Sequence, residues 1–134
     1  MKYVFDTNII TAILNGDQQL AQKIKNSILD GETFFINVIT YYEIKRGLLA
    51  VNATKKLRIF ENLCQKFKVL LLDALPMFDI ASQIYSDLKT KGSLINDADI
   101  LIASMVIFHD CILISDDSDF ERIDNLQLEN WLRH

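Results

Sequence analysis

Short apolar segments rich in β-branched and aromatic residues alternate along this chain with longer segments whose apolar residues recur at helical spacing. The short segments predict strands and the longer ones predict helices. Strands are expected at residues 2–5, 33–37, 69–72 and 111–115, with a last one at 126–129. Strands separated by helices build βαβ units around a parallel sheet covered on both faces. The expected fold class is therefore α/β with a mainly parallel sheet.

Start and stop signals set the expected helix bounds. Helices are predicted at residues 7–14, 18–29 and 39–50, in the segment that contains residues 57–67, and at 76–91 and 97–109. Asn15-Gly16-Asp17 separates the first two helices, Thr54 is expected to cap the fourth, and Gly92 ends the fifth. The chain has one proline and no linker-like stretch, so a single domain is expected over residues 1–134.

Charge and hydropathy narrow the class of protein. No apolar run reaches the roughly 18 residues of a membrane span, and a charge follows the first strand too soon for a signal peptide. A cytoplasmic location, free Cys64 and Cys111 thiols and no zinc site are therefore expected. The net charge of −4 argues against binding nucleic acid by bulk charge alone. It does not exclude a metal-dependent nuclease, because bound cations invert the local field of an acidic site.

Four acidic clusters lie beside or inside apolar segments, where an unpaired carboxylate is costly to bury. They are Asp6 in Phe5-Asp6-Thr7-Asn8, Glu43 in Tyr42-Glu43-Ile44, Asp99 in Asn96-Asp97-Ala98-Asp99, and the run Asp116-Asp117-Ser118-Asp119. Ligands of parallel sheets bind beyond the carboxyl ends of the strands, where the first and last clusters are expected. Carboxylates that converge there would bind a hard divalent cation. Carboxylates that do not converge would be caps and surface charges.

Asp6 and Asp99 each have a structural alternative to metal binding. Asp6 is as suitable for a helix N-cap as for a ligand, since Thr7 or Asn8 could do the capping instead. Asp99 shares a helix face with the core-facing residues 102, 103 and 106, so its carboxylate needs a partner. Its alternative is a capping-box role at the third helical position. Asp97 is expected to be a cap or a solvated charge.

Glu43 and the run at residues 116–119 are weaker signals when taken alone. Spacing favours a surface ion pair between Glu43 and a base such as Lys45 or Arg46. The acidic run is expected to need a cation or to form a solvated loop. Basic pairs such as Lys45-Arg46 are more often solvated helix faces than phosphate contacts. Tyr41-Tyr42 and Trp131 are expected in the core.

The clusters occur within four motifs whose order resembles that of PIN-domain ribonucleases, in particular VapC-type toxins. The motifs are Asp6-Thr7-Asn8; Thr40-Tyr41-Tyr42-Glu43-Ile44-Lys45-Arg46-Gly47-Leu48; Gly92-Ser93-Leu94-Ile95 followed by Asp99-Ile100-Leu101-Ile102-Ala103; and Ile114-Ser115-Asp116-Asp117-Ser118-Asp119-Phe120. The ending Leu128-Glu129-Asn130-Trp131 is similar as well. Ser115 stands where threonine is more usual in the family.

The resemblance implies a three-layer α/β/α sandwich and a Mg²⁺- or Mn²⁺-dependent endoribonuclease. Asp6, Glu43, Asp99 and Asp117 would be the catalytic and metal-binding acids, with Asp119 as the close alternative to Asp117. The same resemblance implies that Thr7, Asn8 and Ser115 orient these carboxylates. If the chain cleaves RNA, the basic pair Lys45 and Arg46 is the candidate for positioning it. The resemblance further implies a VapB-like antitoxin, one or two bound ions and a homodimer.

Two other functions fit parts of the pattern. A PIN-like module that binds or assembles without cleaving would retain the fold and use the acids as structural charges. A Mg²⁺-binding phosphatase or receiver-like α/β domain also places acids at strand ends, but such phosphatases carry a second Asp two residues after the first. Asn8 occupies that position here, which disfavours this alternative.

Overall fold

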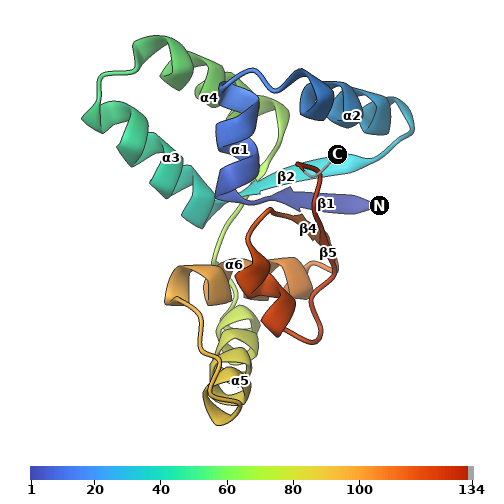
Figure 1. The fold of residues 1–134 in the computed structure, drawn as a ribbon, viewed down its shortest axis with the longest axis vertical. Coiled ribbons are helices and arrows are strands. Elements are labelled where there is room, and N and C mark those ends of the chain that lie inside the picture. Colours follow the sequence, from blue (N-terminus) through green and yellow to red (C-terminus); the bar gives the residue numbers. More distant parts are fainter. Residues whose placement is uncertain (133–134) are drawn as a thin grey trace.

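A computed structural model describes residues 1–132 of the chain, and its centre is a parallel sheet of five strands (Figure 1). The strands lie in the order β3-β2-β1-β4-β5, and each neighbouring pair is parallel. Their bounds are β1 Lys2–Phe5, β2 Thr33–Asn37, β3 Val69–Leu70, β4 Ile112–Ile114 and β5 Leu128–Glu129. The first strand is central, so the chain extends the sheet on one side of β1 before it crosses to the other.

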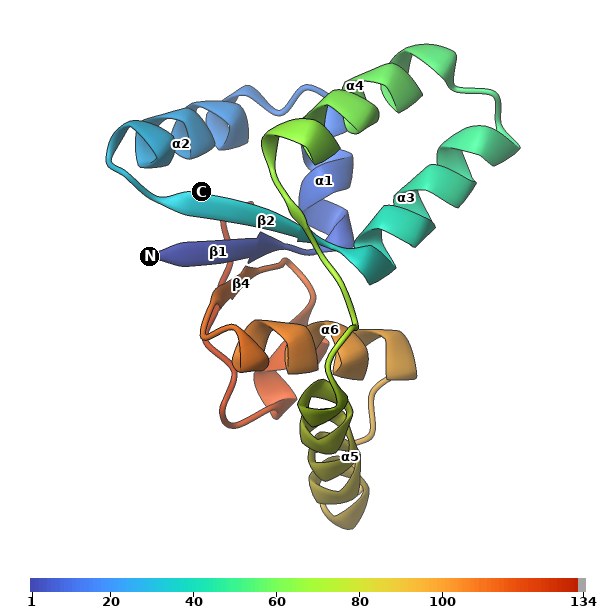
Figure 2. The same cartoon turned by 180° about the vertical axis from the view of Figure 1, so that it is seen from behind.

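Within residues 1–132, six α-helices and one 3₁₀ helix connect the strands. They are α1 Thr7–Leu14, α2 Gln18–Leu29, α3 Val38–Ala50, α4 Thr54–Lys66, α5 Leu75–Thr90, α6 Asp97–Phe108 and the 3₁₀ helix η1 Ser118–Arg122. Figures 1 and 2 show α1 to α4 on one face of the sheet and α5 and α6 on the other. The three-layer α/β/α fold expected from the sequence is thereby confirmed.

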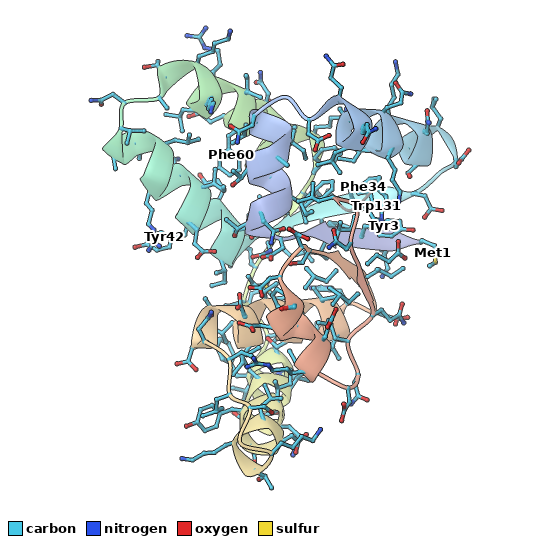
Figure 3. All side chains as sticks on the ribbon, in the orientation of Figure 1. Met1, Tyr3, Phe34, Tyr42, Phe60 and Trp131 are labelled. Atoms are coloured by element: carbon cyan, nitrogen blue, oxygen red, sulfur yellow. The ribbon has the colours of Figure 1, made fainter. Side chains whose placement is uncertain are left out.

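Alternation along β1 separates the two hydrophobic cores. Tyr3 and Phe5 point toward α1–α4, while Val4 points toward α5 and α6, as the two-residue period of a strand requires. Trp131 packs into the first core, where its ring centroid lies 5.1 Å from that of Tyr3 (Figure 3). Its expected core position is confirmed.

Most expected element bounds agree with the structure to within one residue, the last strand is two residues shorter than expected, and three other expectations are wrong. The third strand contains two residues instead of four, because it pairs only with β2 and Leu71 already lies half in solvent. Ala53, and not Thr54, occupies the N-cap position of α4, and the Thr54 hydroxyl donates to the Asn52 carbonyl instead. Tyr42 is 60 % exposed and lies outside the core.

Two further expectations concern cysteines and membranes. Both Cys64 and Cys111 are free thiols, and Cys111 is buried. Within residues 1–132, no helix combines the length and apolar character that crossing a bilayer requires.

Candidate metal centre

The pairing of β1 with β4 brings Asp6 beside Ser115. Phe5 and Ile114 are register partners at the carboxyl ends of these two strands, and the Asp6 amide donates to the Ile114 carbonyl at 3.0 Å. The next residue of each strand therefore leaves the sheet at the same edge. Asp6 begins α1 from there, and Ser115 begins the segment that leads into η1.

The Ser115 hydroxyl connects the two acidic segments. It donates to Asp6 Oδ2 at 2.7 Å and accepts from the Asp117 amide at 3.0 Å. The Asn8 amide group lies 3.3 Å from Ser115 Oγ and 3.4 Å from Asp6 Oδ2, and its Oδ1 accepts from the Asp116 amide at 3.1 Å. Asp6 occupies the N-cap position of α1, but its carboxylate makes no cap bond to that helix. Ser115 and Asn8 thus orient a carboxylate that is 5 % exposed.

The acidic run folds into the start of η1. Asp117 is the N-cap residue, and its Oδ1 accepts from the Asp119 amide at 2.9 Å. One carboxylate oxygen from each of Asp99, Asp117 and Asp119 lies within 4.8 Å of the others. Asp119 also forms an ion pair with Arg122 at 3.4 Å. The sequence left open which acid of the run faces the site, and the structure brings Asp117 and Asp119 to it together.

Asp99 reaches this group from the first turn of α6. Asn96 caps the helix by accepting from the Asp99 amide at 2.9 Å, and its side-chain amide donates to Asp99 Oδ2 at 2.9 Å. A capping partnership and a position among the other acids therefore occur together, although they were alternatives at the sequence level. Asp97 is exposed in the same turn, as expected.

Glu43 is held by a relay of polar side chains that starts in β2. Its Oε1 accepts from the Thr7 hydroxyl at 2.8 Å, so the Thr40 hydroxyl must donate in turn to Thr7 Oγ1 at 3.0 Å. Thr40 accepts from the side-chain amide of Asn37, which also donates to the Phe5 carbonyl. None of the ion pairs within residues 1–132 involves Glu43, which contradicts the surface ion pair that spacing alone favoured.

Sequence reasoning missed Asn37, Thr40 and Asn96 as supporting residues. Asn37 and Thr40 are fully buried polar side chains, and residues that are three apart on a helix share a face. The spacing of positions 37, 40 and 43 could therefore have connected them to Glu43. The sequence predicts Asn96 only as a helix cap, whereas its side chain also donates to the Asp99 carboxylate.

Burial and neighbouring acids raise the pKa values of Asp6 and Asp99. Burial raises the pKa of Asp6 most, and the Asp117 and Glu43 carboxylates raise it further, while the Ser115 hydroxyl and the Thr7 backbone lower it. The pKa of Asp99 is raised from 3.8 to about 6, by burial first and then by Asp6 and Asp117. Without a cation, the ionised form of the cluster is repulsive.

These acids open onto a shared depression of about 470 Å³. It is lined by Asp6, Thr7, Asn8, Thr11, Glu43, Asn96, Asp99 and Asp117. Lys45 and Arg46 lie outside this lining: the Lys45 ammonium donates to the Tyr41 hydroxyl, and the Arg46 guanidinium lies over the Tyr42 ring. An open, acidic depression with only oxygen ligands suits a hard divalent cation.

Comparison with known proteins identifies relatives over almost the full chain. A family model described as the PIN domain matches residues 3–126. The VapC ribonuclease Y4jK of Sinorhizobium fredii is 33 % identical over 126 residues, 88 % of this chain and 89 % of that protein. Ribonuclease VapC2 of Rickettsia felis is 30 % identical over 139 residues, 98 % of each chain.

Solved structures show the same fold. VapBC2 from Rickettsia felis, bound to a DNA fragment from its promoter, contains a chain with a TM-score of 0.85 and 26 % identity, over 98 % of this chain and 99 % of that one. VapBC-1 from nontypeable Haemophilus influenzae contains a chain with a TM-score of 0.87 and 25 % identity, over 99 % of this chain and 100 % of that one.

Proposed function

The chain belongs to the PIN domain family, and we propose that it is a divalent-metal-dependent endoribonuclease that acts as the toxin of a VapBC-type pair. The relatives named VapC ribonucleases support the reaction, and the solved VapBC assemblies support the partner. The observation that carries the proposal is the meeting of Asp6, Glu43, Asp99 and Asp117 around one open depression. If one of these acids lay away from the depression, a binding module without catalysis would be the better interpretation.

The residues present fit a bound Mg²⁺ or Mn²⁺ ion. Every candidate ligand is a carboxylate oxygen, and three of these oxygens lie within 4.8 Å of one another. Burial and then the neighbouring acids raise the pKa of Asp99, and a bound cation would favour its ionised form. Asp6, Asp99 and Asp117, with Asp119 and Glu43 beside them, would hold one or two ions. Such an ion supplies Lewis acidity at the phosphodiester and lowers the pKa of a water nucleophile.

The surrounding side chains would keep these acids ionised and oriented. The Ser115 hydroxyl fixes one oxygen of Asp6, and the Asn96 amide fixes one oxygen of Asp99. Thr7, supported by Thr40 and Asn37, fixes Glu43 on the other wall of the depression. Because hydroxyl and amide donors favour the carboxylate form, they oppose the protonation that burial promotes.

The direct test is cleavage of a labelled single-stranded RNA in Mg²⁺ or Mn²⁺ and in EDTA. The parent chain should cleave only with metal, and Asp6→Ala and Asp99→Asn should each lower the rate by at least about 100-fold, as expected when a metal ligand is lost. Asp97→Asn is the matched control, because this exposed carboxylate lies two residues from Asp99 and outside the depression. Undiminished cleavage by both site variants would refute the mechanism. A parent that binds RNA without cleaving it would favour the binding module.

The proposal extends to partners and location. A VapB-like antitoxin should bind the chain and suppress cleavage, which co-purification and inhibition assays would test.

We also propose a homodimer, because the α5–α6 surface exposes Phe78 and Tyr85 around a hollow of about 360 Å³. Light scattering on the purified chain would decide between monomer and dimer. An RNA substrate and such an antitoxin imply a cytoplasmic location, which cell fractionation would check.

A further inference from the structure

Basic residues are concentrated in one part of an otherwise acidic chain. Residues 38–68, which contain α3 and α4 and are called the basic arm below, hold seven of the 14 Lys and Arg residues but two of the 18 Asp and Glu residues, a net charge of +5. The remainder of the chain therefore carries −9. The seven cations are Lys45, Arg46, Lys55, Lys56, Arg58, Lys66 and Lys68. Figures 1 and 2 show α3 and α4 extending together away from the sheet.

The cations of the basic arm are not neutralised by nearby carboxylates. The three ion pairs within residues 1–132 involve the N-terminus, Lys91 and Arg122, and none includes a cation of the arm. Six of the seven side chains are exposed, and Lys45 is half-buried. Glu61 interacts electrostatically with Lys45, but the arm keeps its net charge of +5. A net positive surface of this kind attracts a polyanion.

A groove leads from the candidate metal centre onto the basic arm. It encloses about 280 Å³ between α1, α3 and α4. Thr7, Thr11 and Glu43 line both this groove and the acidic depression, so the two hollows lie side by side. At the other end the Lys56 ammonium lines the groove and donates to Asn15 Oδ1 at 2.8 Å. A chain whose phosphate lies at the carboxylates could thus continue toward a cation.

Gly47 leaves the wall of this groove open. It lies within α3 and lines the groove, where glycine costs a helix about 1 kcal/mol relative to alanine. Neither its backbone nor its packing requires glycine: its φ is not in the left-handed region, and a Cβ there would meet no atom within 4 Å. A side chain at this position would instead project into the space between α3 and α1.

An exposed ring lies next to Glu43 on the arm. Tyr42 is 60 % exposed, and the Arg46 guanidinium lies 4.9 Å from its ring centroid. Figure 3 shows Tyr42 projecting from α3 away from the packed interior. An exposed aromatic ring beside an arginine can stack on an unpaired base, while the cation contacts a phosphate.

We propose that the basic arm binds the sugar–phosphate backbone of single-stranded RNA adjacent to the cleaved bond, with Arg46 and Lys56 as phosphate contacts and Tyr42 as a stacking surface. This inference rests on the proposed ribonuclease function and names the surface that holds its substrate. RNA is favoured over an acidic peptide because the groove begins at the acids that would face the cleaved phosphate. The acidic depression itself repels a polyanion, so the affinity must come from a surface outside it.

The test measures binding of a short fluorescein-labelled single-stranded RNA by anisotropy in EDTA, which keeps the RNA intact. The double variant Arg46→Gln/Lys56→Gln is compared with Lys25→Gln/Lys89→Gln, which removes two exposed cations outside the arm and so matches the change in net charge. Each lost phosphate contact should reduce the slope of log K against log salt concentration by about 0.7. The arm variant should therefore lose about 1.4 in slope and bind on the order of tenfold more weakly at 0.1 M salt, and the control should differ little from the parent.

Gly47→Gln provides a second, independent measurement. Because glutamine is a better helix former, this variant should have a higher melting temperature than the parent. It should nevertheless bind the RNA more weakly, since its side chain occupies the groove. Weaker binding in a more stable protein cannot be attributed to misfolding.

The outcomes separate this inference from the ribonuclease proposal. If the arm variant and its control bind RNA equally, the inference is wrong even where the parent cleaves RNA. It is also wrong if the arm variant loses only the binding of an antitoxin peptide. If the arm variant alone loses RNA binding while the parent shows no cleavage in Mg²⁺ or Mn²⁺, RNA binding by the basic arm is confirmed and the proposed ribonuclease activity is refuted.

Discussion

Replacing Asp99 with asparagine should stabilise the metal-free protein. The Asp99 carboxylate is half-buried, and this burial, followed by the charges of Asp6 and Asp117, raises its pKa from 3.8 to about 6. Ionisation therefore disfavours the folded state. The asparagine side chain keeps the shape and can still accept the hydrogen bond from Asn96. At neutral pH the variant thus loses a repulsion without leaving a cavity.

The size of this effect follows from the two pKa values. A rise from 3.8 to about 6 corresponds to roughly 3 kcal/mol at 1.36 kcal/mol per tenfold change in ionisation. Because Asp99 is half in contact with solvent, screening reduces the net gain to about 1–1.5 kcal/mol. For a chain of this length, the melting temperature should rise by roughly 3–6 °C.

The pH dependence of stability tests independently whether Asp99→Asn is more stable than the parent. The folded-state pKa of Asp99 is raised, so its penalty is absent below the unfolded value of 3.8 and fully developed above about 6. The stability advantage of Asp99→Asn should therefore be largest at pH 7 and shrink toward pH 4. Thermal unfolding in EDTA across this range measures it, with Asp97→Asn as the exposed control.

Added Mg²⁺ should cancel the stability advantage of Asp99→Asn over the parent. At tenfold excess over its dissociation constant, a cation bound only to the folded parent adds about 1.4 kcal/mol, and Asp99→Asn should lose most of this gain. A variant that is less stable than the parent in EDTA at pH 7 would show that the acids do not repel one another. The electrostatic account of the candidate site would then be wrong.

Three further predictions concern the supporting residues. Thr40→Val should destabilise the fold by about 1–3 kcal/mol, because the buried Asn37 amide loses an acceptor, whereas Thr54→Val at an exposed position should change the free energy of unfolding little in urea titrations. Ser115→Ala should weaken Mg²⁺ binding measured by calorimetry, since Asp6 loses its 2.7 Å hydrogen bond, and Ser115→Thr should restore it; equal affinity in all three proteins would contradict this role. Burial raises the pKa of the Cys111 thiol, so it should react with a disulfide reagent far more slowly at pH 8 in the native protein than in urea.

Local pattern accounts for most of the fold. The strand at Lys2–Phe5 and the helices Thr7–Leu14 and Gln18–Leu29 have the bounds that periodicity and stop signals predict. The failures fall at the sheet edge and in the arm. Val69–Leu70 is short because an edge strand has one neighbour, and Tyr42 is exposed because α3 buries the face that carries Thr40 and Ile44. Neither cause is visible in a window of neighbouring residues.

Some residues of the candidate site were also predictable from local pattern, and others were not. Helix-face position distinguished Asp99 from Asp97, and strand ends brought Asp6 toward residues 116–119. Glu43 followed only from the family resemblance, because the relay that holds it runs through Thr7 and Thr40, more than 30 positions apart in the chain. Its role, like that of the other site acids, stays a prediction until variants are assayed.

The sequence by itself determined the elements, the layers and the carboxylates available for a metal, because helix and strand periods depend on residues close together in the chain. Only the tertiary structure decided which acids meet, that Asp119 joins Asp117 and Asp99, and that a groove connects them to the basic arm. These facts depend on the parallel pairing of β1 with β4 and on the packing of α1 against α3. Such contacts join residues far apart in the chain, so no local pattern records them.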